Sequence, residues 1–235
     1  MTLDRRSVSE STTARLSLYL RSLEVLEAEK VGHVSSQSFA RRFDLNSAQI
    51  RKDLATFGEF GVRGVGYEVS SLRRHLLALL GLDRTRHLAI VGAGRLGTAL
   101  ADYPGFRSGG FAVAAMFDTD PAKIGTQTRS GVTISEIGEL PEKAEALRIQ
   151  IAVLTVPGDA ALAAAQLCWD SGIQAVLNFT PARLSPPAHV HVKNVDLKIN
   201  LETLSFYIGG GPPRPAREKE DSWRRTRSRS FPRRT

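Results

Sequence analysis

Cysteine is nearly absent from this chain, since Cys168 is the one cysteine among 235 residues. A single cysteine excludes an internal disulfide, and its place in the run AALAAAQLCWD predicts a small core residue. No apolar run approaches the length of about 18 residues that a membrane-spanning helix needs. The N-terminal segment MTLDRRSVSESTTAR also lacks the apolar core of a signal peptide. These absences predict a cytoplasmic protein with no membrane partner.

Outside the C-terminal tail, basic and acidic residues nearly balance, so the chain has little net charge there. The formal net charge is +8, but residues 209–235 hold nine Lys/Arg and three Asp/Glu, whereas the other 208 residues hold 23 and 21. The tail is rich in Gly, Pro, Ser and Arg, so it is predicted to be disordered. The alternative is a salt-sensitive, sequence-independent contact with a polyanion. The basic composition is therefore no evidence for specific DNA binding.

Amphipathic periodicity predicts several helices near the N-terminus. Apolar residues spaced by three and four positions place helices at 12–30, from about Ser35, at 47–57 and at 72–80. Between the last two, the stretch FGEFGVRGVGYEV combines glycines with β-branched residues, which predicts a tight hairpin. Helix, turn, helix and hairpin form the pattern of a winged-helix domain.

A different pattern follows the boundary at Gly81-Leu82-Asp83, where apolar strand-like runs alternate with helical segments. The strand-like runs lie at 87–91, 111–118, 151–156 and 174–178, and the clearest helices lie at 96–103 and 160–171. Buried strands separated by helices predict a parallel sheet with helices on both faces. This region is therefore predicted to be a Rossmann-like α/β domain.

The first of these strands runs into VGAGRLGTAL, a full GxGxxG between a strand and a helix. Its first glycine permits a tight turn, its second lets a pyrophosphate approach the backbone, and its third lets helix and strand pack closely. The phosphates would meet N–H groups at the start of the helix. The candidate dinucleotide-binding residues here are Gly92, Ala93, Gly94, Arg95, Leu96 and Gly97. The alternative is a glycine-rich turn that serves packing alone.

Further candidate ligands lie where the other predicted strands end. Asp118 closes the strand FAVAAMFD, at the place where an acidic residue accepts from the adenine ribose hydroxyls. Its carboxylate would repel a 2′-phosphate, so NAD(H) is favoured over NADP(H). The junctions Thr155-Val156-Pro157 and Asn178-Phe179 are candidates for the nicotinamide half, although proline can also serve as ordinary loop punctuation there.

A catalytic apparatus does not accompany this fingerprint. A hydride-transfer enzyme needs a substrate domain and an acid–base group near the nicotinamide. Residues 84–208 suffice for the dinucleotide fold and little more, and the five histidines are scattered. His189 and His191 have the spacing of one strand face, but no cysteine or carboxylate cluster accompanies them, so no metal site is expected. Catalytic residues are therefore not expected either.

The third predicted helix carries polar side chains opposite its apolar face, among them Asp53 and Thr56. Gln49 can pair with adenine and Lys52 can donate to guanine, whereas Ser47 and Arg51 suit phosphates. At the hairpin tip, Arg63 beside Gly64 suits a narrow minor groove. Solvated helix faces commonly look like this, but the combination with an Arg-tipped wing predicts DNA binding.

Several longer motifs are more specific than any of these patterns. They are NSAQIRKDLATFGEFGVRGVGYEV, VGAGRLGTALADYPGF, FDTDPAKIG, LTVP, LNFTPARLS and NVDL, in order through residues 13 to about 208. Together they resemble the Rex family of bacterial redox-sensing transcriptional repressors. The Arg-rich tail is the chief departure from the family pattern.

The resemblance implies a homodimer that binds an inverted-repeat operator in double-stranded DNA and releases it when NADH binds, with NAD+ as the competing ligand. It places Gln49, Arg51, Lys52, Arg63 and Tyr67 at or near the DNA. It also implies that the helix over 197–208 is exchanged between subunits, although an in-cis core helix has the same apolar stripe.

The resemblance further implies a switch between two contacts of one aspartate. Asp196 of NVDL would pair with Arg21 on the first helix, or alternatively with Tyr103 of YPGF. All three residue types stand at the matching positions of this chain.

These interpretations give four segments: a winged-helix DNA-binding domain over 1–82, a Rossmann-like NAD(H)-binding domain over 83–195, a dimerisation helix over 196–208 and a basic tail over 209–235. The leading hypothesis is an NADH-responsive repressor without enzymatic activity. One alternative is an NAD-dependent dehydrogenase with an accessory nucleic-acid-binding domain. Another is a winged-helix regulator that responds to a different nucleotide, such as a CoA ester.

Overall fold

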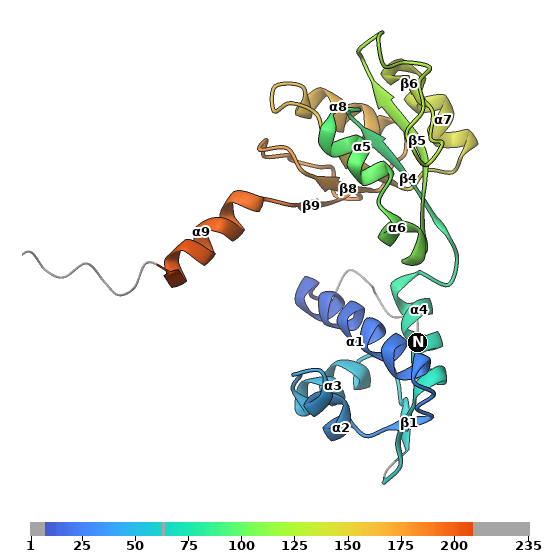
Figure 1. Cartoon of the computed structure of the whole chain (residues 1–235), viewed down its shortest axis with the longest axis vertical. Coiled ribbons are helices and arrows are strands. Elements are labelled where there is room, and N and C mark those ends of the chain that lie inside the picture. The colour runs from blue at the N-terminus through green and yellow to red at the C-terminus, as the bar shows by residue number, and fades with distance from the viewer. Residues whose placement is uncertain (1–7, 63, 209–235) are drawn as a thin grey trace, which may run out of the picture. The chain divides into compact units, whose positions relative to one another are not determined.

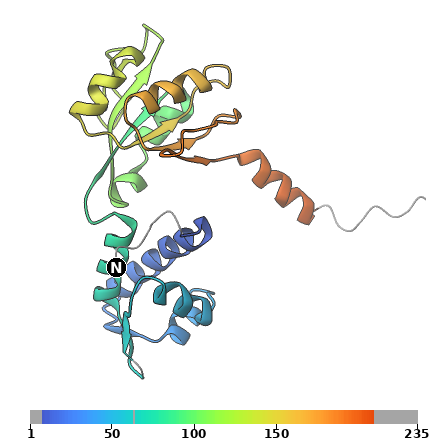
Figure 2. The same cartoon turned by 180° about the vertical axis from the view of Figure 1, so that it is seen from behind.

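The structure, a computed structural model, describes residues 8–62 and 64–208. The chain divides into two compact units, Met1–Asn194 and Val195–Thr235, and the second contains helix α9 (Leu197–Ile208). Figures 1 and 2 show the elements from opposite sides. None of the helices within the described ranges is long and apolar enough to cross a membrane. The predicted tail and Arg63 lie outside the described residues.

The N-terminal elements form a winged helix. They are α1 (Glu10–Ala28), β1 (His33–Val34), α2 (Ser36–Arg42), α3 (Ser47–Ala55), β2 (Gly61–Val62), β3 (Gly66–Glu68) and α4 (Val69–Leu80). The three strands pair antiparallel in the order β1-β3-β2, so the predicted hairpin is the wing.

Local sequence determines where these helices begin and end. Side-chain oxygens of Ser9, Ser35 and Asn46 accept from backbone N–H groups and cap α1, α2 and α3. The first helix therefore starts at Glu10, earlier than periodicity predicted. Gly81 ends α4 in the left-handed conformation, with φ 69°.

The second region is a parallel α/β sandwich. Its strands are β4 (Arg86–Val91), β5 (Phe111–Asp118), β6 (Ile134–Glu136), β7 (Ile151–Leu154), β8 (Ala175–Asn178) and β9 (His191–Asn194). Its helices are α5 (Arg95–Ala101), α6 (Pro104–Ser108), η2 (Ile137–Glu139), α7 (Leu140–Ala146) and α8 (Ala161–Asp170). Periodicity missed the short elements β6, α6 and α7, because three to seven residues are too few to show a period.

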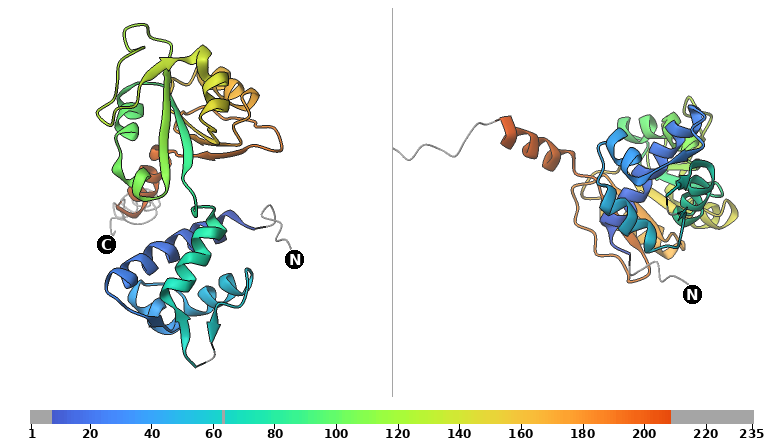
Figure 3. Two further views of the ribbon diagram at one scale, coloured as in Figure 1. Left: turned by 90° about the vertical axis from the view of Figure 1, so that its right-hand side faces the viewer. Right: turned by 90° about the horizontal axis from the view of Figure 1, so that it is seen from below.

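Alternation along β4 divides the side chains between two cores. Ala89 and Val91 pack with residues of α7 and α8, whereas Leu88 and Ile90 pack with residues of α5 and α6. Figure 3 shows helices on both sides of the strands. The strand order β6-β5-β4-β7-β8-β9 reverses direction between β4 and β7, as in a Rossmann fold. The predicted fold class is confirmed.

We expect the substitution Gly97→Ala to destabilise the α/β domain. A Cβ at Gly97 would lie 1.9 Å from the carbonyl oxygen of Gly92, so α5 would have to move away from β4. Overpacking of this kind costs about 1–3 kcal/mol, measurable as a shift of the urea unfolding midpoint. Gly138→Ala is the control, because a Cβ there meets nothing within 4 Å. Equal midpoints for the two variants would contradict the close approach.

Candidate dinucleotide and nucleic-acid sites

A crevice lies where the strand order reverses, at the carboxyl ends of β4 and β7. Thr155, just after β7, donates its hydroxyl to the carbonyl oxygens of Val91 at 3.1 Å and Gly92 at 2.8 Å, which ties the two strand ends together. The cavity there measures about 810 Å³. Its lining comprises Val91, Gly92, Gly94, Phe117, Asp118, Thr119, Asp120, Lys123, Ile137, Thr155, Val156, Pro157, Ala160, Ala163, Ala164 and Leu167.

Asp118 is held in this cavity by three hydrogen bonds. Its Oδ2 accepts from the backbone N–H of Ala93 at 2.6 Å and from Lys123 Nζ at 3.2 Å, and its Oδ1 accepts from the N–H of Asp120 at 2.9 Å. Burial opposes ionisation, but the backbone N–H groups and the ammonium outweigh it and hold the pKa of Asp118 below its ordinary value. The carboxylate therefore stays charged and anchors the glycine loop as well as facing the cavity.

The predicted dinucleotide residues divide into those that line this cavity and those that do not. Gly92, Gly94, Asp118, Thr155, Val156 and Pro157 line it. Ala93 and Gly97 are buried and do not line it, Arg95 and Leu96 are exposed at the start of α5, and Phe179 is half-buried.

Asn178 has a structural place that the sequence did not indicate. Its side chain is buried, and its Nδ2 donates to the carbonyl oxygen of Ala182 and to Asn194 Oδ1. Its Oδ1 accepts from both the N–H and the hydroxyl of Thr180. Both N–H groups and the oxygen of the amide are thereby used, so a cofactor contact would require breaking this network.

The sequence did not indicate two further parts of the cavity lining, Lys123 and the residues of α8. Lys123 lies between Asp118 and Asp120, at 3.2 and 3.4 Å from their carboxylate oxygens, and the motif DPAKIG carries it. Asp120 also accepts from the N–H of Ala122, so it forms the turn expected of such a motif. The part from α8 is apolar, and its alanines resemble ordinary core positions. Among the described residues, no cluster of three or more His, Cys, Asp or Glu could hold a metal ion.

The polar face of α3 presents the predicted DNA residues. Arg51 and Lys52 are exposed, Ser47 and Gln49 are half-buried, and Gly64 is exposed in the wing. Arg51 donates to the hydroxyl of Ser36 on α2 at 3.0 Å, which joins the two helices of the helix-turn-helix.

Two side chains expected at this surface lie in the core instead. Asp53 is 3% exposed, because Arg15 and Tyr19 of α1 bind its carboxylate. Tyr67 is 9% exposed, and its ring lies 2.9 Å from where a Cβ on Gly61 would stand. Tyr67 thus packs the wing from within, and its place at or near the DNA stays a prediction.

The three predicted switch residues lie on different elements. Arg21 is exposed on α1, and Tyr103 is 55% exposed at the start of α6, beside a second cavity of about 530 Å³. Asp196 Oδ1 accepts from the N–H groups of Lys198 and Ile199, which makes it the cap of α9. The proposed exchange of partners therefore has to compete with this capping role.

A winged helix joined to a dinucleotide-type α/β domain defines a class of protein, the ligand-responsive transcriptional regulator. Family comparisons agree with both halves. Residues 7–55 match the family described as "Putative DNA-binding protein N-terminus", and residues 83–182 match the family described as "CoA binding domain".

Relatives along most of the chain define the family. The redox-sensing transcriptional repressor Rex of Desulfitobacterium hafniense is 45% identical over 202 residues, which is 86% of this chain and 96% of that one. The Rex repressor of Thermus thermophilus is 48% identical over 201 residues, 86% of this chain and 94% of its own. The chain belongs to the Rex family of redox-sensing transcriptional repressors. The expectation of a repressor rather than an enzyme is thereby confirmed.

Comparison with solved structures also finds repressor structures that match most of the chain. The crystal structure of RSP in complex with beta-NAD+ and operator DNA matches with a TM-score of 0.82 and 35% identity, covering 89% of this chain and 94% of that one. The structure of RSP in complex with beta-NADH matches with a TM-score of 0.76 and 34% identity, covering 86% and 95%.

Stability at alkaline pH offers a test of the buried carboxylate network. Burial and the hydrogen bond to Asp53 raise the pKa of Tyr19 to about 12. Because this folded-state value exceeds the unfolded one near 10, the stabilisation is complete below about pH 10 and is lost as pH rises toward 12. We expect the gap in unfolding free energy between wild type and Tyr19→Phe to shrink by about 2 kcal/mol over that range. A pH-independent gap for Tyr19→Phe would contradict the network.

Proposed function

We propose that this chain is a dimeric, cytoplasmic repressor that binds an inverted-repeat operator and releases it when NADH occupies the crevice of the α/β domain. The observation that supports this most directly is the pairing of a winged helix with a switch-point crevice in a chain 45% identical to a Rex repressor. NAD+ is the competing ligand, as the two complexes of RSP indicate.

The residues around the crevice fit a dinucleotide. Gly94 has φ −79°, and a Cβ on it would meet nothing within 4 Å, so the backbone is open to a ligand on that side. A carboxylate of the Asp118 type can accept from ribose hydroxyls, and its contacts with Ala93 and Lys123 hold it in place. When bound, the nicotinamide supplies a ring whose charge differs between the oxidised and reduced forms. An apolar pocket favours the uncharged, reduced form because burying a charge is costly.

Coenzyme A is the second candidate ligand, because the family description for residues 83–182 names it. The cavity carries two carboxylates, Asp118 and Asp120, against the ammonium of Lys123. This balance disfavours a phosphate on the ribose, which coenzyme A and NADP(H) carry and NAD(H) lacks. The crevice therefore favours NAD(H).

DNA recognition is proposed for the exposed face of α3 and for the wing. Lys52 and Gln49 would contact base edges, Ser47 and Arg51 would contact phosphates, and the wing with Gly64 and Arg63 would approach the minor groove.

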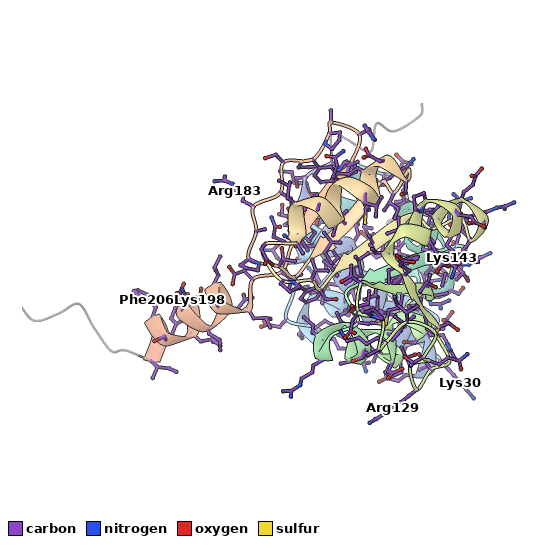
Figure 4. The ribbon with its side chains drawn as sticks, turned by 90° about the horizontal axis from the view of Figure 1, so that it is seen from above. Lys30, Arg129, Lys143, Arg183, Lys198 and Phe206 are labelled. Carbon is purple, nitrogen blue, oxygen red and sulfur yellow. The ribbon has the colours of Figure 1, made fainter. Side chains whose placement is uncertain are left out.

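Dimerisation is proposed to use α9. Its apolar side chains Leu197, Ile199, Leu201, Leu204, Phe206, Tyr207 and Ile208 are 57–84% exposed. Figure 4 labels Lys198 and Phe206 on this helix. An apolar helix whose side chains are exposed in this way is stabilised when a second subunit buries it, which supports exchange between subunits. In such a dimer, Asp196 would alternate between Arg21 and Tyr103.

Fluorescence anisotropy of a labelled inverted-repeat duplex tests the proposal. We expect NADH, titrated at fixed NAD+, to release the DNA from wild type, whereas coenzyme A and NADPH have little effect. Asp118→Ala should bind DNA and respond at least tenfold more weakly to NADH, because it loses both the ribose acceptor and the anchor of the glycine loop. Asp170→Asn on α8, away from the cavity lining, should respond like wild type. Retention of the operator by wild type at saturating NADH would refute the proposed function.

Gly94→Ala separates ligand binding from folding. A methyl group at Gly94 meets no protein atom within 4 Å, so unfolding should match wild type. The methyl group would occupy space where the pyrophosphate approaches, and we expect NADH affinity to fall by about tenfold or more while operator binding persists. Isothermal titration calorimetry measures this, with Gly138→Ala as the control. Unchanged NADH affinity would place the ligand elsewhere.

A further inference from the structure

A carboxylate is buried in the recognition helix α3, next to the residues proposed to contact DNA. Asp53 binds Arg15 through two hydrogen bonds, Nε to Oδ2 at 2.6 Å and Nη2 to Oδ1 at 2.8 Å. The hydroxyl of Tyr19 donates to Oδ2 at 2.9 Å, and Nε2 of Gln49 donates to Oδ1 at 2.7 Å. Two of the three donor residues, Arg15 and Tyr19, therefore lie on α1, and the third, Gln49, lies on α3 among the residues proposed to contact DNA.

Stability alone does not account for this network. The side chain of Arg15 keeps 32% of its surface exposed while that of Asp53 is buried, and burying a charged group costs so much solvation that apolar residues of similar volume often serve stability equally well. The carboxylate also fixes the relative positions of the side chains that bind it. Each carboxylate oxygen accepts one hydrogen bond from the planar guanidinium of Arg15 and a second from Tyr19 (Oδ2) or Gln49 (Oδ1), so the position of the carboxylate is closely defined.

The fixed position of the Asp53 carboxylate determines the orientation of the Gln49 side-chain amide. A free glutamine amide can turn by 180°, which exchanges its oxygen and its nitrogen. An ionised carboxylate accepts hydrogen bonds and donates none, so Asp53 holds the nitrogen of Gln49 toward itself. Within the described part of the chain, no further hydrogen bond of this amide is found. The carbonyl oxygen and the second N–H are then the acceptor–donor pair that adenine requires at N6 and N7.

We propose that Asp53, held by Arg15 and Tyr19, is a positioning residue that orients the Gln49 amide to read an A·T base pair of the operator. This rests on the proposed function, since it requires that α3 bind DNA. The substitution Asp53→Asn replaces a group that only accepts hydrogen bonds with one that both donates and accepts, so the amide of Gln49 could face it either way and the reading of the base pair would be lost.

The experiment is a double-substitution cycle that measures discrimination between base pairs. Anisotropy gives the affinity of full-length protein for the operator and for duplexes with each base pair of one half-site changed in turn. Gln49→Ala identifies the base pair at which preference is lost, by about tenfold. Asp53→Asn should lose preference at that same base pair, while its affinity for random-sequence DNA stays within about twofold. The double variant should discriminate no worse than either single variant.

Controls separate this role from folding and charge. Asp83→Asn removes a carboxylate from an exposed position and should leave discrimination unchanged. Tyr19→Phe keeps the core shape and removes one anchor, so it should lose part of the preference at the Gln49 base pair. If Asp53→Asn fails to fold, Tyr19→Phe alone tests whether the network orients Gln49.

The outcomes also distinguish the two proposals. Wild type without any operator preference refutes the proposed function itself. Wild type with a preference that Asp53→Asn or Tyr19→Phe retains, or that Gln49→Ala leaves intact, overturns the positioning role alone. Equal losses on operator and random DNA, with multiplicative effects in the double variant, would show that Asp53 serves structure only.

Discussion

The close contact between helix α5 and strand β4 is the constraint on which the dinucleotide crevice depends. Gly97 can approach the carbonyl oxygen of Gly92 because it carries no Cβ. That approach brings the start of α5 to the sheet at the place where the strand order reverses. Thr155 completes the arrangement by bonding the same carbonyl oxygen from the end of β7. The crevice is therefore a product of backbone packing, and its polar groups are added to a shape that already exists.

Two carboxylates with lowered pKa values hold the functional parts of the two domains. Asp118 binds the backbone of the glycine loop, and Asp53 binds side chains of α1 and α3. In each case burial opposes the charge and several donors outweigh it. A buried carboxylate with this many donors keeps its neighbours in one arrangement, because moving any of them leaves a charge without its partners.

Features that depend on residues close together in the sequence could be predicted, whereas features that depend on distant partners could not. The helix periods, the hairpin and the GxGxxG between strand and helix are local, and the structure places them where they were expected. The burial of Asp53 and the hydrogen-bond network of Asn178 could not be predicted from the sequence, because their partners lie elsewhere in the chain, at Arg15 and Asn194. A residue on the polar side of an isolated helix can still be buried once another helix packs against it. The apolar lining from α8 gave no signal, since alanine lines cavities and cores equally well.

The position of the Asp53 network bears on how ligand binding can reach the DNA. NADH releases DNA only if it binds the released arrangement more tightly, and a shift from 99:1 to 1:99 needs about 5.5 kcal/mol of differential affinity. Arg15 and Tyr19 lie on α1, the helix that also carries Arg21, six residues and about 9 Å along the axis from Arg15. A two-hydrogen-bond pair tolerates little displacement, so a shift of α1 would disturb Asp53 and then Gln49. If Arg21 makes different contacts in the DNA-bound and the released arrangements, α1 takes part both in base recognition through Asp53 and in the response to the ligand. A change in one of these would then affect the other.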